Sequence, residues 1–294
     1  MTAAALHAET VRPRYQAWLP LRWLVPLIAA WFALTYAFPA IQASGVPSTA
    51  PRLLIQILVA LGLWVGLERT DLTGRQRLGV WLAVMVPYTL WLAIVWSAAI
   101  NGAFLPDHFP PRLPLAIFIP VIIGVPIVLM SKRIGEVLDA LPSHWLVGFQ
   151  VYRVLGGVFL VAWMRGLIPG VFAVPAGIGD MTTGLLALPV AFLLAAGDAP
   201  GRRAAIAWNI LGLTDFAVAI SLGLMTSPGP LQLIVPSIPN ALTGTYPTVL
   251  IPAFAVPSSI LLHTLSLRQL RRAARRAVRY SSAGSSSPIQ AAAG

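Results

Sequence analysis

The chain has 294 residues, of which 57% are hydrophobic and only 10% are charged, with a formal net charge of +11. A soluble domain carries about 25% charged residues, so the composition predicts an all-α integral membrane protein and excludes an ordinary soluble enzyme. Cysteine is absent, which excludes disulfides, iron–sulfur clusters and thiol nucleophiles. The four histidines lack metal-ligand spacing, and we expect neither a metal nor a cofactor.

Apolar runs predict about eight transmembrane helices, because roughly 20 residues cross the hydrocarbon core of a bilayer. The expected spans, in chain order, are 17–38, 52–68, 78–100, 113–131, 146–168, 180–197, 204–226 and 248–267. They give a first four-helix half, 17–140, and a second half, 141–267, between an N-terminal segment, 1–16, and a tail, 268–294. The second and sixth runs are the shortest, and short segments at matching positions are typical of transporter sites.

Basic residues predict the orientation of these spans. Arginine and lysine gather in alternate loops and at both ends of the chain, at Arg12, Arg14, Arg22, Arg69, Arg75, Arg77, Lys132, Arg133, Arg202, Arg203 and from Arg268 to Arg279. Because basic loops stay in the cytoplasm, we expect an N-in/C-in protein. Arginine-rich, alanine-rich usage favours a bacterial source, and hence the inner (cytoplasmic) membrane.

The tail 268–294 is expected to continue the last helix and then to become disordered. Its arginines either contact anionic lipid headgroups or serve only as an orientation signal. No nucleic-acid-binding motif accompanies the charge, so nucleic acid is not an expected partner.

Weak internal similarity suggests a parallel 4+4 tandem repeat. "GRQRLGVW" at 74–81 matches "GRRAAIAW" at 201–208 without a gap, and the repeat aligns Arg22 with Arg153. It also aligns Tyr88 with Asp215, since each lies seven residues after the matched tryptophan. The alternative is that interfacial tryptophans and arginine-bearing loops recur in any such protein.

Two charged residues lie within apolar runs, where a charge usually faces a cavity or a partner. Asp215 lies about 16 Å along the seventh span and Arg153 about 12 Å along the fifth, counted at 1.5 Å per residue. These depths allow an Arg153–Asp215 ion pair. Arg153 is open to three interpretations: its guanidinium snorkels to the headgroups, forms a structural pair, or contacts a ligand. Asp215 is either a structural partner or a proton or substrate site.

Further polar residues lie at comparable depth. Gln150 shares a helix face with Arg153, Asn209 lies on the helix of Asp215, and His263 belongs to a polar stripe on the last span. With Tyr88, they are candidate substrate or proton ligands, and together they suggest a polar pocket that opens toward the cytoplasm.

The loops expected outside the membrane, 166–180 and 227–247, are rich in apolar residues, proline and glycine, which predicts non-helical, re-entrant or lid-like segments. Asp180 ends the first of these loops. It is expected to cap the sixth span at its N-terminus, with an outer gate as the alternative. The adjacent Asp107 and His108 are interpreted as part of a turn.

The function favoured by these patterns is that of a small-solute transporter, with proton coupling as an option. One alternative is a membrane-embedded lipid-modifying enzyme, although no catalytic motif supports an enzyme. The other is a scaffold or assembly protein without a substrate. The expected partners are the lipid bilayer and a small solute.

Overall fold

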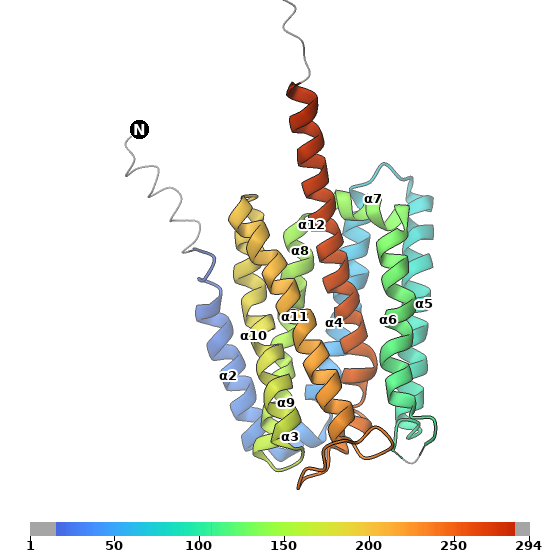
Figure 1. Cartoon of the computed structure of the whole chain (residues 1–294), viewed down its shortest axis with the longest axis vertical. Helices are drawn as coiled ribbons and strands as arrows, with labels where there is room; N and C mark the ends of the chain where they lie inside the picture. The colour runs from blue at the N-terminus through green and yellow to red at the C-terminus, as the bar shows by residue number, and fades with distance from the viewer. Residues whose placement is uncertain (1–15, 107, 286–294) are drawn as a thin grey trace, which may run out of the picture.

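The computed structural model describes residues 16–106 and 108–285, and within these ranges the chain is all-helical, without strands (Figure 1). The helices in chain order are α2 (Leu21–Ala37), α3 (Pro39–Ala43), α4 (Val46–Glu68), α5 (Gly74–Ile100), α6 (Arg112–Met130), α7 (Lys132–Ala140), α8 (Ser143–Gly148), η1 (Phe149–Gly157), α9 (Val158–Met164), α10 (Gly170–Ala195), α11 (Ala199–Thr226), η2 (Leu242–Gly244), η3 (Ile251–Ala255) and α12 (Val256–Ser285).

Some of the expectations fall on residues outside these ranges. Segment 1–15, Asp107 and the tail from residue 286 onward are not described. The tail does begin as a helix, because α12 continues to Ser285. The expected disorder of the Ser/Gly/Ala end stays a prediction, because residues 286–294 lie outside the described residues.

Long helices stand roughly side by side in the molecule (Figure 1). The helix α7 lies at one end of the bundle, and α3 and the loop 227–248 lie at the opposite end; these are called the α7 end and the α3 end. The C-terminal part of α12 extends beyond the α7 end.

Among the described residues, six helical segments are long and apolar enough to cross a membrane: α4, α5, α6, the stretch Ser143–Met164, α10 and α11. Two of the eight expected spans fall short of these criteria. The helix α2 has only 17 residues, and α12 gains arginines from Arg268 onward. The length and composition of the six helices are those of a membrane protein, whereas the eight spans, their orientation and the tandem repeat stay predictions.

Exposed apolar side chains mark the surface that faces lipid. Ile94 on α5 is 59% exposed and Ile122 on α6 is 68% exposed. Only 11% of the apolar window of α6 is buried, against 61% for Ser143–Met164. The fifth expected span, which contains Arg153, therefore runs through the interior of the bundle.

That interior span is not a continuous α-helix. Between α8 and α9 the chain forms the 3₁₀ segment η1, and such mid-helix segments often mark hinges or strain. Glycines allow α10 to approach η1 closely: a Cβ at Gly156 would overlap Asp180, and a Cβ at Gly184 would overlap the backbone of Val154. This close approach brings Asp180 to the level of Arg153.

The start of α10 corrects two expectations. Residues 170–180 were expected to be a non-helical loop, but α10 runs through them with Pro175 inside it, and its N-cap is Pro169 rather than Asp180. Prolines are tolerated in membrane helices where neighbouring groups satisfy the freed backbone. The second and sixth spans are not the shortest either, since α4 has 23 residues and α10 has 26.

Polar caps determine where α5 and α11 begin. The Thr73 hydroxyl accepts from the backbone N–H of Gln76, whose side chain accepts from the Thr73 N–H. Asp198 accepts from the N–H of Gly201 at 2.7 Å. Each cap satisfies backbone donors that a helix start leaves open.

Candidate functional site

Arg153 lies in the interior of the bundle, and its side chain is 1% exposed. Its Nε donates to Asp180 Oδ1 at 2.8 Å, and its Nη2 forms ion pairs with both Asp180 and Asp215. Nη1 donates to the carbonyl of Gly212 at 3.4 Å. The guanidinium carbon lies 3.9 Å from the ring centroid of Phe216, a cation–π distance. Arg153 thus joins η1 to two further helices.

Of the three interpretations of Arg153, the structure contains the ion pair with Asp215 that helix depth allowed, and the guanidinium does not snorkel. The comparison with Arg22 misleads here, because Arg22 is exposed and lies over the ring of Trp23, 5.3 Å from its centroid. Arg153 is instead surrounded by α10, α11 and α12, so its guanidinium is held by protein groups.

Asp180 supplies the second carboxylate of the site. It lies well inside α10, and its side chain is 15% exposed, against 6% for Asp215. Gly179 makes room for this arrangement, because a Cβ there would overlap the Asp215 carboxylate. Two carboxylates therefore surround one guanidinium.

His263 extends the network through α12. Its Nε2 lies 3.0 Å from Arg153 Nη1, and because a guanidinium has no acceptor, Nε2 must accept. Nδ1 then carries the proton and donates to Asn209 Oδ1 at 2.9 Å. Asn209 Nδ2 in turn donates to Ser266 Oγ at 3.0 Å. Arg153, Asp180, Asp215, His263 and Asn209 are hereafter called the Arg153 cluster.

Two candidates lie outside this cluster. The hydroxyl of Tyr88 donates to Ser258 Oγ at 2.9 Å, and its ring packs on Phe254. Gln150 is fully buried, and neither its Oε1 nor its Nε2 has a hydrogen-bond partner in the described part of the chain. Neither is joined to Arg153 by a hydrogen bond among the described contacts.

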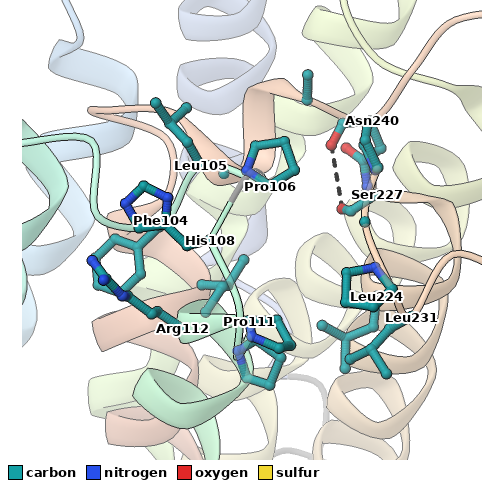
Figure 2. A pocket seen from close by; sticks show the side chains of 17 residues that line it. Phe104, Leu105, Pro106, His108, Pro111, Arg112, Leu224, Ser227, Leu231 and Asn240 are labelled. Carbon is teal, nitrogen blue, oxygen red and sulfur yellow. Dashed lines mark hydrogen bonds between the residues drawn. The ribbon is translucent and has the colours of Figure 1, made fainter.

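Three separate hollows lie in succession between the Arg153 cluster and the α3 end, and neighbouring hollows share lining residues. The outermost has a volume of about 60 Å³ and lies between the loops around His108 and Leu231. Figure 2 shows Arg112 on one side of it and, on the other, Ser227 donating a hydrogen bond to the carbonyl of Asn240. Polar groups from separate segments thus line the entrance.

The next hollow, of about 50 Å³, shares Leu113, Leu224 and Ser227 with the first and reaches Asp180. A third, of about 30 Å³, shares Asp180 with the second and is lined by Arg153. One water needs about 10–15 Å³ by this measure, so these spaces fit a few waters. The polar pocket was expected to open toward the cytoplasm, and this stays a prediction because the orientation is not shown; the hollows described here lie toward the α3 end.

A family model described as a domain of unknown function, DUF8737, matches residues 110–271, more than half of the chain. The chain belongs to the DUF8737 family. No curated protein and no solved structure matches the chain. The DUF8737 match begins just before α6 and contains every member of the Arg153 cluster, whereas Tyr88 lies outside it.

A second charged group lies between α7 and α12 and extends beyond the DUF8737 match, because Arg272 and Arg276 follow residue 271. Asp139 accepts from Arg272 Nε at 2.9 Å and pairs with Arg276 at 3.0 Å. The hydrogen bond from Arg272 lowers the pKa of Asp139, and the same bond raises the pKa of Arg272. Burial lowers the pKa of Arg268, which donates to the carbonyls of Val128 and Ser131.

Sequence reasoning missed several residues that surround Arg153. Phe216 directly follows Asp215, and this adjacency was an available signal for a cation–π contact. The Tyr152–Ser259 hydrogen bond, 2.7 Å long, closes the same region from the side, and no spacing indicated it. Among the described residues, no group of three or more His, Cys, Asp or Glu could hold a metal ion.

Proposed function

We propose that the chain is a membrane transport protein in which the two carboxylates of the Arg153 cluster bind and release a proton. One observation carries the proposal: a buried guanidinium lies between two carboxylates, beside the innermost of the separate hollows that lie toward the α3 end. Two ionised carboxylates and one guanidinium together carry one net negative charge. A buried charge without compensation is costly, and a bound proton removes it.

Proton binding in this place changes contacts between helices. Arg153 joins η1 to α10 through Asp180 and to α11 through Asp215. When a proton neutralises one carboxylate, the guanidinium loses one ionic partner and the two helices are held less firmly. Binding of a proton therefore biases how these helices pack, which is the requirement for coupling to a solute.

Irregular helices beside the cluster provide places for movement. The 3₁₀ segment η1 and the π segment η3 both line the hollow next to Arg153, through Gly156 and Ile251 respectively. Segments of both kinds often occur at hinges and functional sites. The hollows fit waters in this conformation, so a small solute enters only when the helices move apart.

The positive-inside rule places the α7 end, with its basic residues, in the cytoplasm. The hollows then open toward the outer face of what we propose to be a bacterial inner membrane. Asp180 and Asp215 are the proton site, and Arg153 is the counter-charge.

The test uses the full chain reconstituted in liposomes that contain a pH-sensitive dye. An imposed pH gradient is followed by amino acids, small carboxylates, amines and sugars, each added in turn. The wild-type chain is expected to move protons with at least one of these solutes. Asp180→Asn and Asp215→Asn are expected to lose that movement, while Asp139→Asn, the same change outside the cluster, retains it.

Proton movement that persists unchanged in Asp215→Asn would overturn the proposal. A wild-type chain that moves no protons under any of these conditions would do the same. The scaffold alternative makes the opposite prediction, since a purely structural cluster can be replaced by neutral residues without loss of function.

A further inference from the structure

A second and larger cavity lies away from the Arg153 cluster, between α4, α5, α6, α7 and α12. Its volume is about 430 Å³, within the range of about 300–1,000 Å³ that is typical of ligand sites. Its walls are mainly aliphatic, as shown by Leu58, Val84, Ile127, Leu138 and Leu261. Such walls favour an apolar occupant.

The few polar side chains in the cavity lie at separate places. Tyr88 and Ser258 also line it, and they are already bonded to each other. Ser131 and Arg133 line it where α6 meets α7. The cavity therefore has apolar walls and a positively charged side chain, Arg133, where α6 meets α7.

Positive charge surrounds the junction of α6 and α7. Arg268 donates to the carbonyls of Val128 and Ser131, which places its guanidinium at this junction. Arg133 pairs with Glu136 at 3.0 Å, but this pair is well exposed and weak. Five basic side chains face two acidic ones in this region, namely Lys132, Arg133, Arg268, Arg272 and Arg276 against Glu136 and Asp139.

The cavity also meets the lipid-facing side of the molecule. Ala83 lines it and is exposed, and it lies on α5, whose surface is largely apolar and accessible. An acyl chain can therefore enter from the bilayer while its headgroup stays near the basic junction. Charge complementarity at that junction favours an anionic headgroup over a zwitterionic one.

We propose that this cavity binds one acyl chain of an anionic phospholipid, whose phosphate contacts Arg133 and Lys132 at the α6–α7 junction. The acyl chain lies along Leu58, Val84 and Leu261 and makes dispersion contacts with them. The site is independent of the proton site, because no member of the Arg153 cluster lines this cavity.

The test uses the full chain in nanodiscs with a small fraction of a photoreactive phospholipid that carries a diazirine in its acyl chain. Phosphatidylglycerol and phosphatidylcholine with the same labelled chain are compared, and mass spectrometry locates the labelled peptides. We expect phosphatidylglycerol to label residues 58–63 and 80–88 roughly 25-fold more than phosphatidylcholine, since each of the two basic residues that contact the phosphate changes binding about fivefold.

Two variants make the expectation specific. Val84→Phe places a bulky ring on the cavity wall where the acyl chain is proposed to lie, and it is expected to remove most of the labelling. Val86→Phe is the matched control on the same helix, because Val86 is 57% exposed and does not line the cavity. Lys132→Gln with Arg133→Gln is expected to abolish the preference for phosphatidylglycerol while the chain stays folded.

Equal labelling by the two lipids in the wild-type chain would overturn the proposal. So would equal labelling in Val84→Phe and Val86→Phe, or a preference for phosphatidylglycerol that survives in the Lys132/Arg133 variant. If Val84→Phe does not fold, the Lys132/Arg133 variant decides. Competition by a neutral long-chain alcohol as strong as that by phosphatidylglycerol would mean an apolar-solute site and would also overturn it.

Discussion

Removing the guanidinium of Arg153 tests whether the cluster is held together by charge. Arg153→Met leaves Asp180 and Asp215 facing each other without a cation, and it removes the donor to His263. Breaking a buried ion pair from one side costs about 3–5 kcal/mol. For a chain of this size we expect the melting temperature to fall by roughly 6–20 °C, at about 2–4 °C per kcal/mol.

A neutral version of the cluster distinguishes charge from side-chain packing. Arg153→Met combined with Asp180→Asn and Asp215→Asn removes all three charges, and apolar or neutral replacement of buried pairs is often tolerated. Its stability is expected to lie within about 2 kcal/mol of wild type, because the remaining cost is that of unmade hydrogen bonds. This variant is also expected to lose proton transport.

Intrinsic tryptophan fluorescence during heating in detergent measures both variants, since the chain has ten tryptophans and no cysteine for a thiol dye. Arg165→Met serves as the control, because within the described residues Arg165 donates to backbone carbonyls, such as that of Tyr36 at 3.0 Å. Its expected cost is about 1 kcal/mol. The reasoning is refuted if Arg153→Met melts like wild type, or if the triple variant melts no higher than Arg153→Met.

Three further outcomes are expected. Gly179→Ala should lower proton transport, and it should lower stability by about 1–3 kcal/mol, because the added Cβ overlaps the Asp215 carboxylate. Gly79→Ala is the control: a Cβ there meets no atom within 4 Å, so neither proton transport nor the melting temperature should fall. The lowered pKa of Asp139 means that its ion pair contributes stability above the ordinary value of 3.8 and loses it as the pH falls through the lower, folded-state pKa. Melting temperatures measured between pH 7 and pH 3 should therefore show a loss of stability in acid, of about 1 kcal/mol at most for this partly exposed pair. Asp139→Asn should lack this contribution, and equal melting curves for the two proteins would contradict the prediction. Tyr88→Phe should keep proton transport within about twofold of wild type in the dye assay, and it should cost about 1 kcal/mol of stability through the lost hydrogen bond to Ser258. A loss of transport as large as that of Asp215→Asn would contradict the placement of Tyr88 outside the proton site.

Helix depth showed that an ion pair between Arg153 and Asp215 was possible, but it did not show that the two helices are neighbours. Both residues lie on spans that run in the same direction, and a charge deep in an apolar run requires a partner. The second carboxylate was not predicted as part of this site, because Pro175 and the nearby glycines indicated that the sixth span begins at Asp180. In the structure the helix starts at Gly170, so Asp180 lies about 15 Å further along it.

The role of His263 could not be predicted from the sequence either. Its position on a polar stripe was visible, but only the packing of α12 against α11 shows that Nδ1 faces Asn209 and Nε2 faces Arg153. Tyr88 was selected through a repeat that aligns it with Asp215. In the structure it lies on the wall of the apolar cavity, so alignment of weakly similar halves did not identify a shared site.

The orientation of the His263 ring limits the path that a proton can take in the proposed transport. A guanidinium does not give up its proton in a protein, so a proton on Asp180 or Asp215 cannot pass through Arg153 to the ring nitrogen behind it. The side chain of Arg153 therefore blocks proton transfer between the carboxylates and the hydrogen-bonded side chains of His263, Asn209 and Ser266. In the proposed proton transport, a proton in this conformation enters and leaves on the same side of Arg153, and net transport across the membrane requires the Arg153 side chain to move.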